Sequence, residues 1–159
     1  KNVHLSKPKI MTKEYFAQFL KANLPIAEVA GIKLKNFSDF ASQTEVSLSL
    51  MSQNPFKSMF WAVQGMAAEL STGVLCMDKI AKSGKNISML VIKQEADFTK
   101  KAVGTITFSC EQGKELDEII EEAIKTKEGQ IIQVKSEGRD EAGDVVATFY
   151  FTWSFKVKE

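Results

Sequence analysis

The order of hydrophobic and polar residues divides the chain into three helical and six extended segments. Helices are predicted where apolar residues recur every three or four positions, and strands where apolar and polar residues alternate. The expected helices are Met11–Val29, Ser58–Ala81 and Lys114–Lys127. The expected strands are Ile32–Phe37, Phe40–Met51, Asn86–Phe98, Ala102–Glu111, Gln130–Arg139 and Asp144–Lys158. We expect one domain over residues 1–159, with residues 1–11 flexible.

The extended segments predict an antiparallel sheet. The last strand alternates over its whole length and forms a hairpin with the strand before it. The apolar run from Ser88 to Ile92 predicts a central strand. Between these strands, the segment Lys114–Lys127 has one apolar stripe and an acidic first half, so we expect a surface helix that ends at Gly129.

The segment Ser58–Ala81 carries apolar residues on nearly every face, which is typical of a buried helix. Gly65, Glu69 and Gly73 lie four positions apart and therefore share one face. Two glycines on one stripe indicate a close neighbour, either sheet backbone or a bound ligand. Six strands and one apolar helix predict an α+β fold in which a curved antiparallel sheet wraps around that helix.

Glu69 is the single carboxylate within this apolar segment until Asp78 near its end. Burial of a carboxylate is unfavourable unless it is neutral, hydrogen-bonded or functional. Glu69 is therefore either a general base or nucleophile with a raised pKa, or a structural acid bonded to backbone or to a second copy. Asn54, in the Asn-Pro loop before the helix, either orients Glu69, a water or a ligand, or serves as a turn residue.

Composition narrows the function classes. With 44% hydrophobic and 26% charged residues and a net charge of +1, the chain can form a core and offers no electrostatic case for nucleic acid or an anionic membrane. No segment is apolar enough to predict a membrane span. Cys76 and Cys110 are expected to be reduced core thiols of a cytoplasmic protein. With one histidine, His4, we expect no metal, no cofactor and no histidine-dependent nucleophile.

The loop and helix resemble a known family. Asn54 is followed six positions later by Phe60-Trp61-Ala62, and Glu69 lies nine positions beyond Phe60. Hotdog-fold thioesterases of the phenylacetyl-CoA type have a similar order of Asn, His-Gly-Gly and an acid. The preceding Lys-Ser-Met-Phe resembles the Gly-Thr-Met-Phe of a poorly characterised branch with a helix inserted between strands four and five, where Lys114–Lys127 lies here. The resemblance covers about residues 12–157.

The resemblance implies the hotdog fold, a six-stranded antiparallel sheet curved around a long central helix, with an N-terminal helix and a short inserted surface helix. It implies a homodimer or a dimer of dimers that binds an acyl thioester of coenzyme A or acyl-carrier protein in a tunnel at the dimer interface. Glu69 and Asn54 take the catalytic positions. The residues expected to contact the substrate are Met59, Phe60, Trp61 and Gly65.

The same resemblance leaves two hypotheses for the reaction. In the first, the protein is an acyl-CoA thioesterase in which Glu69 activates water and the backbone N–H of residue 60 or 61 polarises the thioester carbonyl. In the second, it binds acyl-CoA or a fatty-acyl chain without catalysis, since Phe60 and Trp61 replace the family's His and Gly. A dehydratase is a weaker third hypothesis, because those enzymes use a histidine together with the acid.

Overall fold

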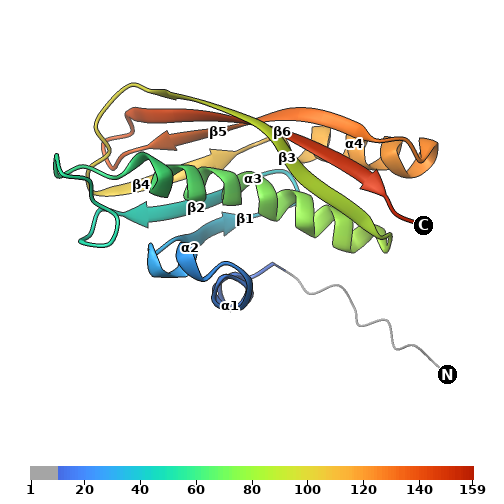
Figure 1. Cartoon of the computed structure of the whole chain (residues 1–159), viewed down its shortest axis with the longest axis horizontal. Coiled ribbons are helices and arrows are strands. Elements are labelled where there is room, and N and C mark those ends of the chain that lie inside the picture. The colour runs from blue at the N-terminus through green and yellow to red at the C-terminus, as the bar shows by residue number, and fades with distance from the viewer. Residues whose placement is uncertain (1–10) are drawn as a thin grey trace.

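The computed structural model describes residues 11–159, which form a curved antiparallel sheet around one long helix (Figure 1). The helices are α1 (Lys13–Asn23), α2 (Pro25–Val29), α3 (Trp61–Ser83) and α4 (Gly113–Thr126). The strands are β1 (Lys33–Phe37), β2 (Ser42–Ser47), β3 (Ile87–Phe98), β4 (Thr105–Cys110), β5 (Gln130–Arg139) and β6 (Val145–Val157). The strand order is β1-β2-β4-β5-β6-β3 with antiparallel pairs throughout, which confirms the predicted hotdog fold.

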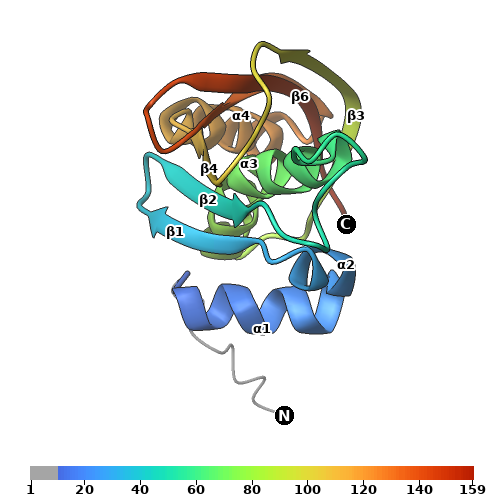
Figure 2. The ribbon, with the colours of Figure 1, turned by 90° about the vertical axis from the view of Figure 1, so that its left-hand side faces the viewer.

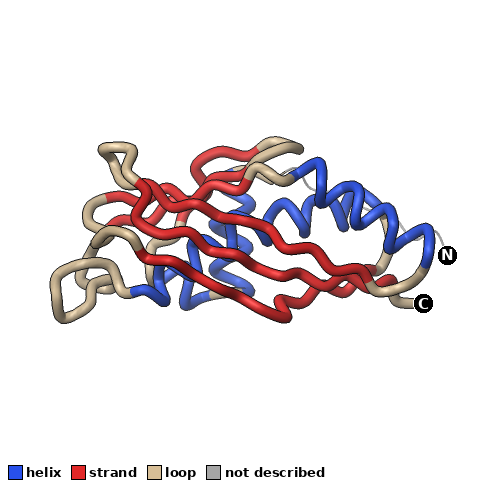
Figure 3. Tube along the Cα trace, turned by 90° about the horizontal axis from the view of Figure 1, so that it is seen from above, coloured by secondary structure: helices blue, strands red, loops and turns tan. Residues whose placement is uncertain are grey.

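The sheet wraps α3 because this helix has apolar residues on nearly all sides. Seen along its length, α3 has β1 and β2 on one side and β3 on the other (Figure 2). Seen from above, the strands form one layer with helices behind it, while one helix lies beside the strands at the right of the view (Figure 3). Ala67, Ala68, Val74, Leu75 and Cys76 of α3 are at most 1% exposed. The helix is thus the centre of the core, as its sequence pattern predicts.

The far end of α3 is held by charges. The ammonium of Lys79 is buried, donates to the Asp39 carbonyl at 2.8 Å and pairs with Asp117 of α4 at 2.9 Å. Lys82 bridges Asp39 and Asp78 at 2.6 and 2.7 Å. These contacts join the end of α3 to α4 and to the β1–β2 turn, which fixes the direction of the helix across the sheet.

The position of β3 differs from the prediction. Its apolar run predicted a central strand, but β3 pairs only with β6 and forms one edge of the sheet. The run is continuous because it is apolar on both faces: Met89 and Val91 pack against the core, while Leu90 and Ile92 are 64% and 49% exposed. The continuous apolar run therefore reflects apolar residues on both faces of β3 and not a second neighbouring strand.

Several element ends also differ. The strand expected over Phe40–Met51 ends at Ser47, and α3 begins at Trp61 because the chain before it is held as a loop. In that loop Met59 N–H donates to the Ala102 carbonyl and Phe60 N–H to the Ser52 carbonyl, both at 2.8 Å. The cap of α4 is Lys127, in the left-handed conformation with φ 59°, and not Gly129.

The N-terminal helix packs beneath the sheet. Thr12 caps α1 by accepting a hydrogen bond from Tyr15 N–H at 3.1 Å, and Phe16 and Leu20 are buried. His4 and most of the segment expected to be flexible, residues 1–11, lie outside the described residues.

A close approach between β4 and β5 depends on Gly138. Gly138 is the direct partner of Phe108, whose ring is fully buried. A Cβ at position 138 would lie 2.5 Å from Phe108 Cε1, so no side chain fits without moving the ring.

We expect Gly138→Ala to lower the free energy of unfolding by about 1–3 kcal/mol, because overpacking at a buried ring cannot relax into solvent. Urea denaturation measures the change. Gly129→Ala is the matched control, since its nearest neighbour, the Phe155 carbonyl oxygen, lies 3.9 Å from the new Cβ. Equal stability of the two variants would contradict this account of the contact.

Candidate functional site

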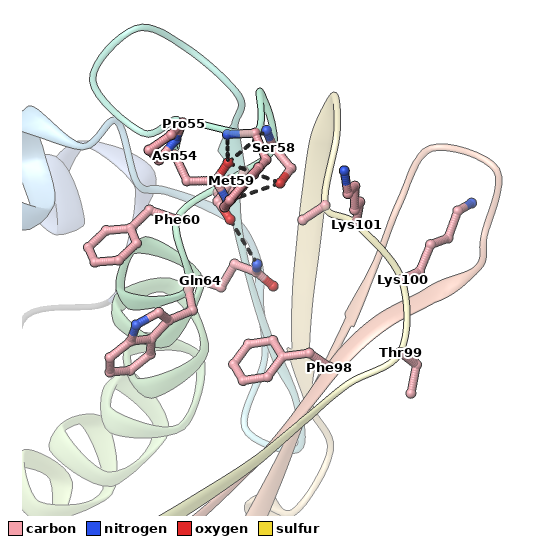
Figure 4. A pocket seen from close by; sticks show the side chains of 13 residues that line it. Asn54, Pro55, Ser58, Met59, Phe60, Gln64, Phe98, Thr99, Lys100 and Lys101 are labelled. Atoms are coloured by element: carbon pink, nitrogen blue, oxygen red, sulfur yellow. Dashed lines mark hydrogen bonds between the residues drawn. The ribbon is translucent and has the colours of Figure 1, made fainter.

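The candidate site is a pocket of about 620 Å³ at the start of α3 (Figure 4). It lies between the loop before α3 and the segment that connects β3 to β4. Four of its aromatic residues are at least 45% exposed: Phe56, Phe60, Trp61 and Phe98. Exposed aromatic side chains gathered around a concave surface are typical of ligand sites.

Asn54 shapes the loop that forms one wall. Its side-chain oxygen accepts from Phe56 N–H at 2.9 Å and from Ser58 N–H at 3.2 Å, and its Nδ2 donates to Ser58 Oγ at 3.0 Å. The adjacent Lys57 has φ 59°, a left-handed conformation. Asn54 thus closes a tight turn, and one N–H of its amide has no acceptor among the described residues.

The first turn of α3, at the edge of the pocket, has backbone donors without acceptors among the described residues. Its N-cap, Phe60, makes no side-chain capping bond, and the N–H groups of Val63 and Gln64 share the Phe60 carbonyl. The N–H groups of Trp61 and Ala62 have no acceptor in residues 11–159. Phe60 N–H is bonded to Ser52, so of the two predicted oxyanion donors only Trp61 is free.

Further along α3, the face with the two glycines lies against aromatic side chains of β6. A Cβ at Gly65 would lie 3.5 Å from Phe149 Cε1, and one at Gly73 would lie 3.6 Å from Trp153 Cζ2. The close neighbour predicted from the glycines is therefore aromatic side chain rather than sheet backbone.

Glu69 lies between these glycines. Trp153 Nε1 donates to Thr72 Oγ1 at 2.9 Å, and that hydroxyl donates to the Glu69 carbonyl at 2.8 Å. The Glu69 carboxyl itself is partly buried, and no hydrogen bond or ion pair to it occurs within residues 11–159. Desolvation by burial raises the pKa of Glu69 to about 7. The group can therefore exchange a proton near neutral pH.

The predicted site residues fall into two groups. Asn54, Met59, Phe60 and Trp61 all line the pocket. Gly65 and Glu69 do not line it. Glu69 is eight residues beyond Trp61, about 12 Å further along the helix axis at 1.5 Å per residue. Within one chain, the free N–H and the carboxyl thus lie two helical turns apart.

Sequence reasoning missed Gln64 as a site residue and treated it only as a break in the apolar pattern. Gln64 lines the pocket but is only 4% exposed. Its Nε2 donates to the Met59 carbonyl at 3.3 Å, whereas its Oε1 is buried without a hydrogen bond. The signal available in the sequence was a lone amide one turn after the helix start.

Within residues 11–159, the cysteines, the metal-ligating side chains and the helices give no sign of a second site. Cys76 and Cys110 are buried and free of a disulfide, as expected for core thiols. Among the described residues, no group of three metal-ligating side chains comes together. None of the helices in this part of the chain is long and apolar enough to cross a membrane.

Comparison with known proteins places the chain in a family and among solved folds. Residues 12–155 match a family described as a domain of unknown function (DUF4442). No curated protein matches the chain.

Three solved proteins share the fold at low sequence identity. A probable thioesterase from Pseudomonas aeruginosa, PA5026, is 15% identical, with 96% of this chain and 100% of that chain covered and a TM-score of 0.77. A putative thioesterase from Shewanella oneidensis is 11% identical, with 92% and 97% covered and a TM-score of 0.74. The Staphylococcus aureus thioesterase SAV0944 is 11% identical, with 83% and 98% covered and a TM-score of 0.63. These likenesses are to the fold. The family match spans most of the chain, which therefore belongs to the DUF4442 family.

Proposed function

We propose that the protein binds an acyl thioester of coenzyme A or of acyl-carrier protein and hydrolyses it with Glu69 as the base. The observation that carries this proposal is the Glu69 carboxyl, which has a pKa of about 7 and lacks a charged partner in the described residues. A carboxyl in this state is suited to general-base catalysis at neutral pH, since its two protonation states are both populated.

In the proposed reaction the Glu69 carboxylate removes a proton from a water as that water attacks the thioester carbon. The C–S bond then breaks, and the thiolate leaves and takes up the proton. Direct attack by the carboxylate, followed by hydrolysis of the resulting anhydride, is the nucleophilic variant of the same step. Both routes generate negative charge on the carbonyl oxygen.

The free N–H of Trp61 is the proposed donor to that oxygen. It lies at the positive end of the α3 dipole, and Trp61 is one of the residues that line the aromatic pocket. The rings of Phe60 and Trp61 pack edge to face with centroids 6.0 Å apart. The Phe60 ring points away from Gln64 and the pocket centre (Figure 4), which leaves the helix terminus open to a ligand.

A second copy of the chain would bring these groups together. Trp61 N–H and Glu69 are two turns apart on one rigid helix, so they cannot both contact the same thioester carbonyl within one chain. The outer edge of β3 is unpaired in the described chain and carries exposed Leu90 and Ile92. Such an edge favours pairing with another strand. We therefore place the partner's Glu69 opposite the pocket of this chain.

The residue types and their interval give further support. Structures of SAV0944 carry alanine in place of a glutamine and of a glutamate that lie fifteen positions apart in that chain. Asn54 and Glu69 are separated by the same interval. We therefore assign the reaction to one pair of groups, the amide of Asn54 in the loop and the carboxyl of Glu69 on the helix.

One observation favours a second candidate function. The family's His and Gly are replaced by Phe60 and Trp61, and Phe60 offers no polar group to a substrate. A protein with this change could hold an acyl thioester or fatty-acyl chain without cleaving it. The hydrolysis experiment below separates the two functions.

We expect Glu69→Gln to raise stability at pH 8 and to leave it nearly unchanged at pH 4. Since the pKa of Glu69 is raised from 4.5 to about 7, the folded state binds more protons than the unfolded state between these values. Wild-type stability therefore falls as pH rises through this window. The variant should gain about 1–3 kcal/mol at pH 8, after allowance for partial exposure.

Urea denaturation at pH 4, 6 and 8 measures this difference. Glu118→Gln is the matched control, because it removes a carboxyl from the exposed face of α4. A stability gain that does not depend on pH would rule out the assigned desolvation.

We expect hydrolysis of acyl-CoA to require the ionised Glu69. Release of free thiol, followed for acyl chains of two to sixteen carbons, should show a kcat/KM that rises with pH and is half-maximal near pH 7. Glu69→Gln should lower kcat/KM by roughly 100-fold or more, because it removes the base. Equal rates for the two proteins would exclude Glu69 as the base. Tight binding of S-decyl-CoA without thiol release from any substrate would support the binding function instead.

Mixing two inactive variants tests whether the site is shared. If one chain supplies the Asn54 loop and its partner supplies Glu69, heterodimers of Asn54→Ala and Glu69→Gln contain one intact site. Random exchange of subunits should then restore about one quarter of wild-type activity, since half of the dimers are mixed and each has one good site. If the mixture stays as inactive as each variant alone, Asn54 and Glu69 of the same chain act together, and the shared site is excluded.

A further inference from the structure

The amide of Gln64 is the strongest unused feature of the pocket. It lies in the first turn of α3, three residues after Trp61, and is 4% exposed. A carbonyl can only accept a hydrogen bond, so the end of the Gln64 amide that faces the Met59 carbonyl is assigned as the donor Nε2. The Oε1 atom is therefore the end without a partner.

A buried acceptor without a donor is unfavourable, and native structures seldom retain one without a functional reason. Gln64 also lines the pocket, and in Figure 4 its side chain and that of Phe98 point towards each other from α3 and β3. A ligand that entered between these two side chains would lie next to the amide oxygen of Gln64, which accepts a hydrogen bond from an N–H group.

We propose that Gln64 Oε1 accepts a hydrogen bond from the pantetheine arm of the thioester, at the amide N–H nearest the sulfur. This rests on the proposed function, which puts the thioester carbonyl at Trp61 N–H. Residues three apart are neighbours on a helix surface, so a group bound at Trp61 continues past Gln64. In acyl-CoA and acyl-carrier protein alike, the amide closest to the sulfur is on this arm.

The lysines that line the pocket favour the same direction of binding, with the pantetheine arm leading away from Trp61. Lys100 is occupied by Asp140 and Asp144 at 2.6 and 2.8 Å. Lys101, its neighbour on the pocket wall, has no ion pair within residues 11–159. A cation remains there for the phosphate that ends the pantetheine arm.

The test measures binding of two probes by titration calorimetry. S-decyl-pantetheine carries the amide N–H groups, and 2-(decylthio)ethanol has the same alkyl thioether without them. Gln64→Met, which keeps the length of the side chain, should weaken S-decyl-pantetheine roughly 5- to 30-fold and change 2-(decylthio)ethanol by no more than about 2-fold. Gln133→Met, at an exposed position on β5, is the matched control and should change neither.

A loss of affinity that is equal for both probes, or no loss, overturns the contact. The wild-type protein gives an independent test that needs no variant. Methylation of the amide nitrogen nearest the sulfur in S-decyl-pantetheine should weaken binding by a similar factor, and an unchanged affinity would reject the proposal. If wild type binds S-decyl-CoA but is insensitive to these changes, only the role of Gln64 fails. If wild type binds none of the thioethers, the proposed function fails as well.

Discussion

The packing of α3 against the aromatic face of β6 is the contact on which the rest of the molecule depends. Gly65 and Gly73 face Phe149 and Trp153, whose rings would be in ordinary van der Waals contact with a Cβ at either position, and the Trp153–Thr72 hydrogen bond joins the helix to the strand. Because the helix is then central, the sheet must curve around it to cover its remaining apolar sides. Replacement of either glycine by a large residue would separate two layers that share one core.

This packing also determines the chemistry of Glu69. The Glu69 side chain is partly buried, and no hydrogen bond or ion pair to its carboxyl occurs within residues 11–159. Desolvation is then the dominant effect on its pKa. Burial within the packed fold therefore raises the pKa of Glu69 by itself, and neither Asn54 nor any lysine is needed for the shift.

The fold was predicted well because the strongest patterns in the sequence come from residues that pack in the core. The alternation from Asp144 to Lys158 and the all-apolar α3 specified a hairpin, a buried helix and the curved sheet. Strand order was not predictable in the same way, since the run at Ser88–Ile92 is apolar on both faces and reads like a central strand. The Asn-Pro loop before α3 was predicted, but its end was placed too early, at Ser58 instead of Phe60. The hydrogen bonds that hold Met59 and Phe60 in the loop go to the backbone of Ala102 and Ser52, which the local pattern does not reveal.

The candidate site was predicted as one cluster, and the structure divides it. The residues of the Asn54 loop and the start of α3 meet in a pocket, while Glu69 lies two turns along the helix. Sequence spacing gives the order of groups on a helix but cannot say which of them face one substrate. On a rigid helix, an interval of eight residues separates the backbone of Trp61 from that of Glu69 by about 12 Å. The proposed reaction, which uses both groups at one carbonyl, therefore rests on a second chain, and the edge of β3 that is unpaired within the described residues is the edge to which the proposal assigns that chain.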